Sequence, residues 1–78
     1  STYQNAIRVV ELNEKNLVTA KLNFNRTKEL YDLGKVTNTQ FRQAQLNFAR
    51  TKSTLVNSSF QVKLAEADLI RISGSLLE

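Results

Sequence analysis

Large hydrophobic residues recur at every seventh position in both halves of this chain. The first half has Tyr3, Val10, Leu17, Phe24 and Tyr31, and the second half has Phe41, Phe48, Leu55, Val62 and Leu69. A second set, mostly of small residues, lies three positions after them: Ala6, Asn13, Ala20 and Thr27, then Ala44, Thr51, Ser58, Ala65 and Ile72. This spacing is the heptad pattern of coiled-coil helices. We therefore expect two long helices, at about residues 2–33 and 38–73.

The two heptad patterns also match each other when the chain folds back on itself. The numbers of the facing residues then add up to one constant value, and the large pairs are Tyr3 with Leu69, Val10 with Val62, Leu17 with Leu55, Phe24 with Phe48, and Tyr31 with Phe41. The small rows keep the same step, so small residues of one helix can receive large residues of the other. The sequence therefore predicts an all-α fold, an antiparallel two-helix coiled-coil hairpin, in which Phe24 and Phe48 face each other.

A short turn at residues 34–37 is predicted from its own residue types. Gly34 follows the last periodic residues, where a helix commonly ends in a left-handed conformation that glycine adopts at low cost. Thr37 and Gln40 have the spacing of a capping box, in which the hydroxyl and the amide each satisfy a free backbone N–H. At the far end, we expect residues 73–75, which read Ser-Gly-Ser, to stop the second helix.

A further set of apolar residues lies off the predicted seam. It consists of Ile7, Val9, Leu12, Val18, Leu22 and Leu30 in the first helix, and Leu46, Val56, Phe60, Leu64 and Ile70 in the second. Two helices cannot bury both sets between themselves, so this set predicts contact with helices of other chains or of a larger parent protein. For the isolated chain we expect self-association into a helical bundle, with two hairpins as the simplest form.

The composition argues for a structural role rather than catalysis. The chain lacks cysteine and histidine, so it offers no thiolate nucleophile and no usual zinc ligand, and no glycine-rich phosphate loop is present. The carboxylate pairs, Glu11 with Glu14 and Glu66 with Asp68, meet no base or metal partner and are interpreted as solvated helix faces. We therefore expect no enzyme activity, no catalytic residue, no metal and no cofactor.

Charge and hydropathy point to neither nucleic acid nor a membrane span. The net charge is +4, but the eleven basic and seven acidic residues are mixed along the chain, without the clustered basic stripe of a nucleic-acid interface. No apolar run approaches the ~20 residues of a spanning helix, and no signal peptide opens the chain. Tyr31 and Lys35 flank the turn, where a functional contact and a plain structural role are both open.

Two stretches of the sequence resemble the TolC-like outer membrane efflux proteins. The first is residues 30–47, with Leu30, Tyr31, Gly34 and Thr37 followed by an alanine-glutamine helix, and the second is residues 64–74, which end in Ser-Gly. The resemblance implies one hairpin of the periplasmic α-helical tunnel of a trimeric channel in the Gram-negative outer membrane, used for drug efflux or type I secretion. The partners it implies are a periplasmic adaptor protein and an inner-membrane pump.

The same resemblance implies roles for the turn. In that family the hairpin turns close the tunnel and meet the adaptor, which assigns a docking tip to Leu33, Gly34, Lys35, Val36 and Thr37. Tyr31 matches a closing tyrosine, whereas Val36, Gln40 and Gln43 stand where relatives carry an arginine and two aspartates. Closure through Tyr31, Gln40 and Gln43 would then use packing and neutral hydrogen bonds. The ending of the chain favours the second of the family's two internal repeats.

Two alternatives remain open at this point. The hairpin of a periplasmic adaptor protein carries Arg, Leu and Ser at a spacing that Arg26, Leu30 and Thr37 fit, with Thr for Ser. Adaptor hairpins lead into β-rich halves, however, whereas residues 69–77 resemble the end of a TolC-like helix. A generic coiled-coil dimerisation module is the other alternative, and it would need none of the residues of the turn.

Overall fold

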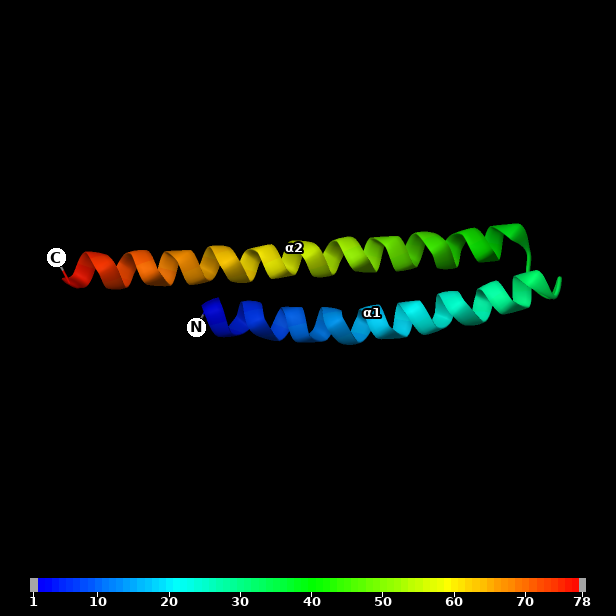
Figure 1. Ribbon diagram of the computed structural model, residues 1–78, viewed down its shortest axis with the longest axis horizontal. Coiled ribbons are helices and arrows are strands. Elements are labelled where there is room, and N and C mark those ends of the chain that lie inside the picture. Colours follow the sequence, from blue (N-terminus) through cyan, green and yellow to red (C-terminus); the bar gives the residue numbers. More distant parts are fainter. Residues whose placement is uncertain (1, 78) are drawn as a thin grey trace.

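The chain forms one long antiparallel hairpin of two helices (Figure 1). A computed structural model describes the backbone of residues 2–77 and the side chains of residues 2–72 and 74. Helix α1 comprises Thr2–Asp32 and helix α2 comprises Asn38–Leu77. The hairpin measures 66 × 15 × 12 Å, and α2 extends past the start of α1. The predicted all-α hairpin is therefore confirmed.

The helix ends differ from the predicted ones at two places. Helix α1 ends at Asp32, one residue early, because Leu33 already belongs to the turn. Helix α2 continues through Gly74 to Leu77, so the expectation that residues 73–75 stop it is wrong. Glycine weakens a helix interior by about 1 kcal/mol relative to alanine, but it ends a helix only where it turns left-handed. Among the described residues only Gly34 has a positive φ.

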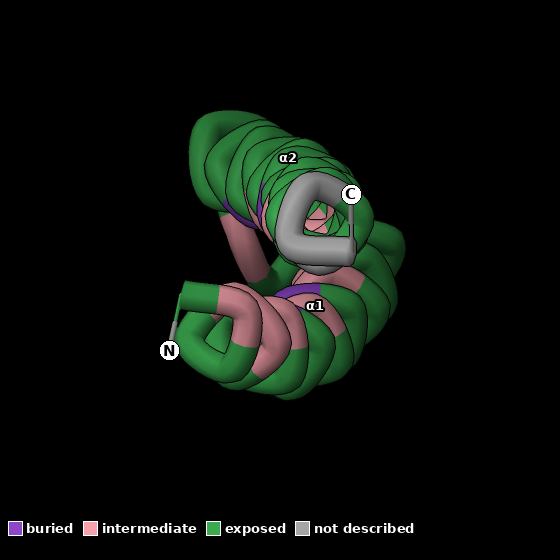
Figure 2. The backbone as a smooth tube through the Cα atoms, turned by 90° about the vertical axis from the view of Figure 1, so that its left-hand side faces the viewer, coloured by how far each residue is buried: buried purple, intermediate pink, exposed green. Residues whose placement is uncertain are grey.

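The seam between the helices is closest at its small residues. Among the described residues, those that are buried are Asn13, Ala20, Ala44 and Ser58, all from the small row. The large residues of the seam flank these contacts and are half-buried along most of its length. Figure 2 shows the buried and half-buried parts of the two backbones turned toward each other, with exposed residues on the outer sides. Small side chains therefore set the separation of the helices.

The hydroxyl groups of three seam residues are satisfied by their own helices. The hydroxyls of Thr27 and Thr51 donate to the carbonyl oxygens of Asn23 and Asn47, each at 2.8 Å. Ser58 donates to the Leu55 carbonyl at 2.9 Å. A small hydroxyl side chain thus keeps the close approach without leaving an unpaired donor in the seam.

The predicted register is confirmed by its aromatic residues. The ring centroids of Phe24 and Phe48 lie 5.5 Å apart, and those of Tyr31 and Phe41 lie 4.6 Å apart. Phe24 also stacks on Phe41, at 5.8 Å, so its ring contacts two aromatic residues of α2. The Lys52 ammonium lies over the Phe48 ring, 4.2 Å from its centroid. Four aromatic rings therefore join the helices in the half of the hairpin next to the turn.

Most of the apolar residues off the seam are exposed, as expected from their positions. The exposed members are Val9, Leu12, Val18, Leu22, Leu46, Val56, Phe60, Leu64 and Ile70, whereas Ile7 and Leu30 are half-buried. The two helices thus leave a large apolar surface without a partner in the hairpin. Neither helix, over its described residues, has a stretch long and apolar enough to cross a membrane.

Candidate functional site at the hairpin tip

The end of α1 is closed by a left-handed glycine. Gly34 has a φ of 72°, and its N–H donates to the Tyr31 carbonyl at 2.9 Å. The N–H of Lys35 donates to the Leu30 carbonyl at 2.8 Å. These two bonds form a Schellman motif, which satisfies carbonyl groups that a helix end otherwise leaves free. The predicted conformation of Gly34 is confirmed, and it fixes the direction in which the chain leaves α1.

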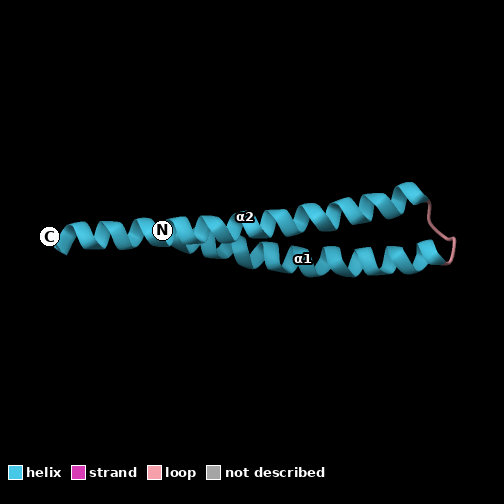
Figure 3. Cartoon of the chain, turned by 45° about the horizontal axis from the view of Figure 1, so that its top comes forward, coloured by secondary structure: helices cyan, strands magenta, loops and turns pink. Residues whose placement is uncertain are grey.

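The start of α2 is closed by the predicted capping box. The N–H of Gln40 donates to the Thr37 hydroxyl oxygen at 3.1 Å, and the N–H of Thr37 donates to Gln40 Oε1 at 2.8 Å. The Thr37 hydroxyl also lies 3.3 Å from Gln40 Oε1 and can donate to it. The backbone bond from Phe41 N–H to the Thr37 carbonyl, at 3.0 Å, begins the helix. Residues 33–37 are thus held between two capped helix ends (Figure 3).

The tip places its longest side chains in the open. Leu33 is 68% exposed, the highest value among the exposed large hydrophobic residues, and Lys35 is exposed beside it. Val36 is half-buried, and it lines a shallow groove with Gln40 and Gln43 on one side of the hairpin. Leu33 and Lys35 are therefore the tip residues that another protein can reach most easily. Gly34 and Thr37 are also exposed, but their backbone and hydroxyl groups are engaged in the two caps.

The three residues assigned to tunnel closure are in different states. Tyr31 is 37% exposed, and its ring stacks on Phe41 with an interplanar angle of 6°. The side-chain carbonyl of Gln40 is taken by Thr37 in the capping box. Gln43 is exposed, and its amide makes no hydrogen bond within the described hairpin. Gln43 is thus the one whose polar group is open to a neighbouring chain.

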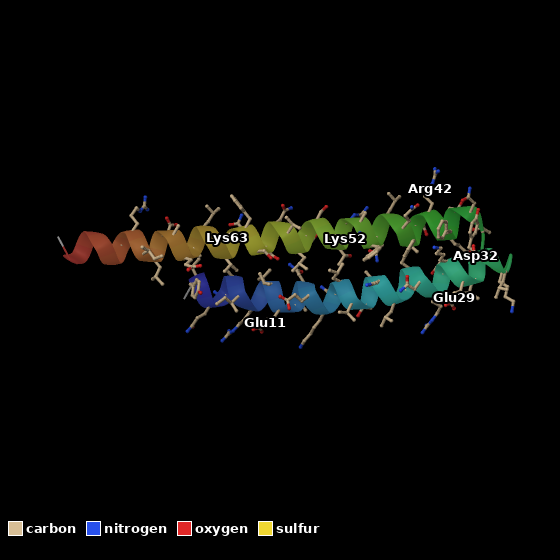
Figure 4. The ribbon with its side chains drawn as sticks, in the orientation of Figure 1. Glu11, Glu29, Asp32, Arg42, Lys52 and Lys63 are labelled. Carbon is tan, nitrogen blue, oxygen red and sulfur yellow. The ribbon has the colours of Figure 1, made fainter. Side chains whose placement is uncertain are left out.

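Charged residues of both signs surround the tip. Glu29 and Asp32 lie near the end of α1, and Arg42 projects away from the hairpin near the start of α2 (Figure 4). Within the described residues, the ion pair that forms is Arg71 with Asp68, at 3.3 Å, far from the turn. The charged residues beside the tip therefore form no ion pair within the described hairpin.

The sequence did not indicate how far the aromatic contacts extend behind the tip. The pairing of helices predicted Phe24 with Phe48 and Tyr31 with Phe41, but not the contact between Phe24 and Phe41. Phe41 and Phe48 lie two helical turns apart on one face, so a ring from α1 can sit between them. The seven-residue spacing of Phe41 and Phe48 is the sequence feature from which the second contact of Phe24 could have been predicted. The stacked rings stabilise the contact between the two helices behind the tip.

The described part of the chain holds no candidate metal site. It contains no group of three or more His, Cys, Asp or Glu side chains placed to hold a metal ion. No family model, curated protein or solved structure matches the chain. The resemblance to TolC-like proteins therefore rests on the residues quoted for it.

Proposed function

We propose that the chain is a periplasmic tunnel hairpin of a TolC-like outer membrane channel, and that its turn is the surface that docks a periplasmic adaptor protein. The observation that carries the proposal is the tip, where Leu33 and Lys35 stand exposed on a turn capped on both sides. Preformed loops bind with a lower entropic cost than flexible ones. A capped turn at the end of a 66 Å hairpin suits contact with a partner that approaches end-on.

The chemistry of the tip defines what the partner must offer. Leu33 supplies an apolar side chain that is 68% exposed, and Lys35 supplies a positive charge beside it. An adaptor surface with a small apolar pocket and an acidic or carbonyl rim would complement this pair. Val36 would lie at the edge of the contact, because part of its surface already packs in the hairpin.

Tunnel closure in this proposal depends on packing more than on charge. Tyr31 is braced by Phe41, and Gln40 is held by Thr37, so neither can swing freely into the tunnel. Gln43 has its amide open to form neutral hydrogen bonds with a neighbouring hairpin. The exposed apolar residues off the seam would be covered by the adjacent helices of the tunnel wall.

The proposal is tested in the full-length parent protein by replacing Leu33, Lys35 and Val36 with serine together. Gly34 and Thr37 stay intact, so both caps remain. We expect export to be lost while helicity and trimer content are unchanged, because only the docking surface is removed.

A matched control is Arg42→Ser, which also removes a positive charge close to the tip but on a side chain that points away from it (Figure 4). We expect this variant to export normally. Normal export by the triple variant would mean that the tip has only a structural role.

A further inference from the structure

Helix α2 carries a second heptad row on the side facing away from α1. Its large members are all exposed: Leu46 at 57%, Val56 at 67%, Phe60 at 58% and Ile70 at 64%. The positions between them complete the same spacing of three and four residues, with Ala49, Ser53, Lys63 and Ala67. One helix with heptad rows on two sides can pack against two partners, and α1 covers only one of these rows.

The corresponding side of α1 does not carry such a row. Charged residues occupy most of it, among them Arg8, Glu11, Lys15 and Glu29. A partner that covers the row of α2 is therefore not a second helix like α1. The best match available within the chain is α2 itself, from a second copy.

An antiparallel pair of α2 helices matches this row residue by residue. With a two-fold axis level with Ser58, Leu46 of one copy faces Ile70 of the other, and Val56 faces Phe60. Ala49 then faces Ala67, so the large apolar residues meet one another and the alanines do the same, whereas Ser53 faces Lys63. The hairpin itself already uses this arrangement, since its seam pairs aromatic rings at some levels and small residues at others.

The charges beside the row select the antiparallel orientation. In that orientation Lys52 of one copy lies on the same edge of the interface as Glu66 of the other, twice per dimer. A parallel pair would instead set Lys63, which lies within the row, against Lys63 of the second copy. Like charges at one level oppose association. Lys52 and Lys63 lie along α2 in Figure 4.

We infer that two copies of this chain associate through the outer row of α2, back to back and antiparallel, into a four-helix bundle with a two-fold axis near Ser58. Such an interface is isologous, because each copy contributes the same patch. The inference concerns this chain by itself and goes beyond the proposed docking role of the tip. In the antiparallel dimer the two tips lie at opposite ends of the bundle.

The first test measures the mass of the 78-residue chain by sedimentation equilibrium. We expect a dimer at micromolar concentration, and Phe60→Ser should raise Kd by about 100-fold, because the two-fold axis places two copies of this side chain in one interface. The matched control is Leu22→Ser, which removes an apolar side chain that is 63% exposed on α1. It should leave Kd within about threefold of the unchanged chain.

The second test reads the orientation through disulfide formation, which is clean because the chain has no cysteine. A chain with Ala49→Cys is mixed with a chain with Ala67→Cys and oxidised. The antiparallel dimer predicts the mixed 49–67 disulfide in excess over both homodisulfides, because these two positions lie about 27 Å apart along one helix. A parallel dimer would give the two homodisulfides.

The third test reverses the charges. Lys52→Glu and Glu66→Lys should each weaken the dimer by about tenfold, and the double variant should recover most of the lost affinity. Arg26→Glu, which makes the same charge change on α1, should have little effect.

Three results would overturn the inference. They are a chain that is still monomeric at about 100 µM, a dimer whose Kd is unchanged by Phe60→Ser, and a predominance of 49–49 and 67–67 disulfides. None of these depends on the export experiment, so the dimer and the docking tip fail or survive separately.

Discussion

Replacing Phe48 with alanine removes one ring of the aromatic contact between the two helices. The Phe48 ring stacks on Phe24 with a centroid distance of 5.5 Å, and Lys52 lies over it at 4.2 Å. The substitution leaves Phe24 with Phe41 as its remaining aromatic partner. It therefore tests whether the register of the hairpin is held by these rings.

The expected cost follows from the burial of the side chain. A fully buried Phe→Ala change costs about 3–5 kcal/mol, and Phe48 is half-buried, which lowers this part to about 2 kcal/mol. The stacked pair adds about 0.5–1.5 kcal/mol, and the Lys52 contact adds about 0.5 kcal/mol at an exposed site. We expect a total loss of about 3 kcal/mol, which is a large part of the stability of a domain this small.

The assay is urea unfolding followed by circular dichroism, with all variants at one low protein concentration so that association contributes equally. Phe48→Leu keeps apolar volume but loses the ring contacts, and we expect it to cost about 1 kcal/mol. Leu22→Ala, at an exposed position on α1, should cost less than about 0.5 kcal/mol. An unchanged midpoint for Phe48→Ala would refute the register, and equal losses for Phe48→Ala and Leu22→Ala would refute the calculation from burial.

Three further substitutions, two of them with a matched control substitution, test the turn and the seam. Thr37→Ala removes the cap hydroxyl and should cost about 1 kcal/mol in the same urea titration. Gly34→Ala places a Cβ on a left-handed residue and should lower the free energy of unfolding by about 1 kcal/mol. Its control is Gly74→Ala, in open space within α2, which should raise the helical circular dichroism signal slightly. Equal effects of the two substitutions would contradict the φ angles. Ala20→Leu overfills the closest part of the seam and should cost about 1–3 kcal/mol, whereas Asn25→Leu, on the exposed side of α1, should be nearly neutral.

The hairpin could be predicted from the sequence because its periodicity and its turn residues agree. The heptads of the two halves share one register, and the structure confirms it at Phe24 with Phe48 and at Tyr31 with Phe41. The end of α2 could not be predicted, because glycine can either end a helix or remain inside it. At Gly34 the following residues form a cap that favours the left-handed conformation, whereas at Gly74 the helix continues.

The geometry of the tip was predictable for a similar reason, while its use was not. The spacing of Thr37 and Gln40 indicates a capping box, since each group can satisfy the backbone N–H of the other. The exposure of Leu33 and the half-burial of Val36 depend on how the chain crosses between the helices, which a linear pattern does not specify. The occupied carbonyl of Gln40 and the open amide of Gln43 are likewise set by the local fold.

The docking role of the tip is tested most directly by crosslinking in the full-length parent protein in cells. A photoreactive amino acid is placed at Lys35, and in a matched strain at Lys15, which is exposed on the flank of α1. Our account predicts a crosslink from position 35 to a periplasmic adaptor protein and none to it from position 15. No adaptor crosslink from position 35, with the channel present at its normal level in the outer membrane, would contradict it.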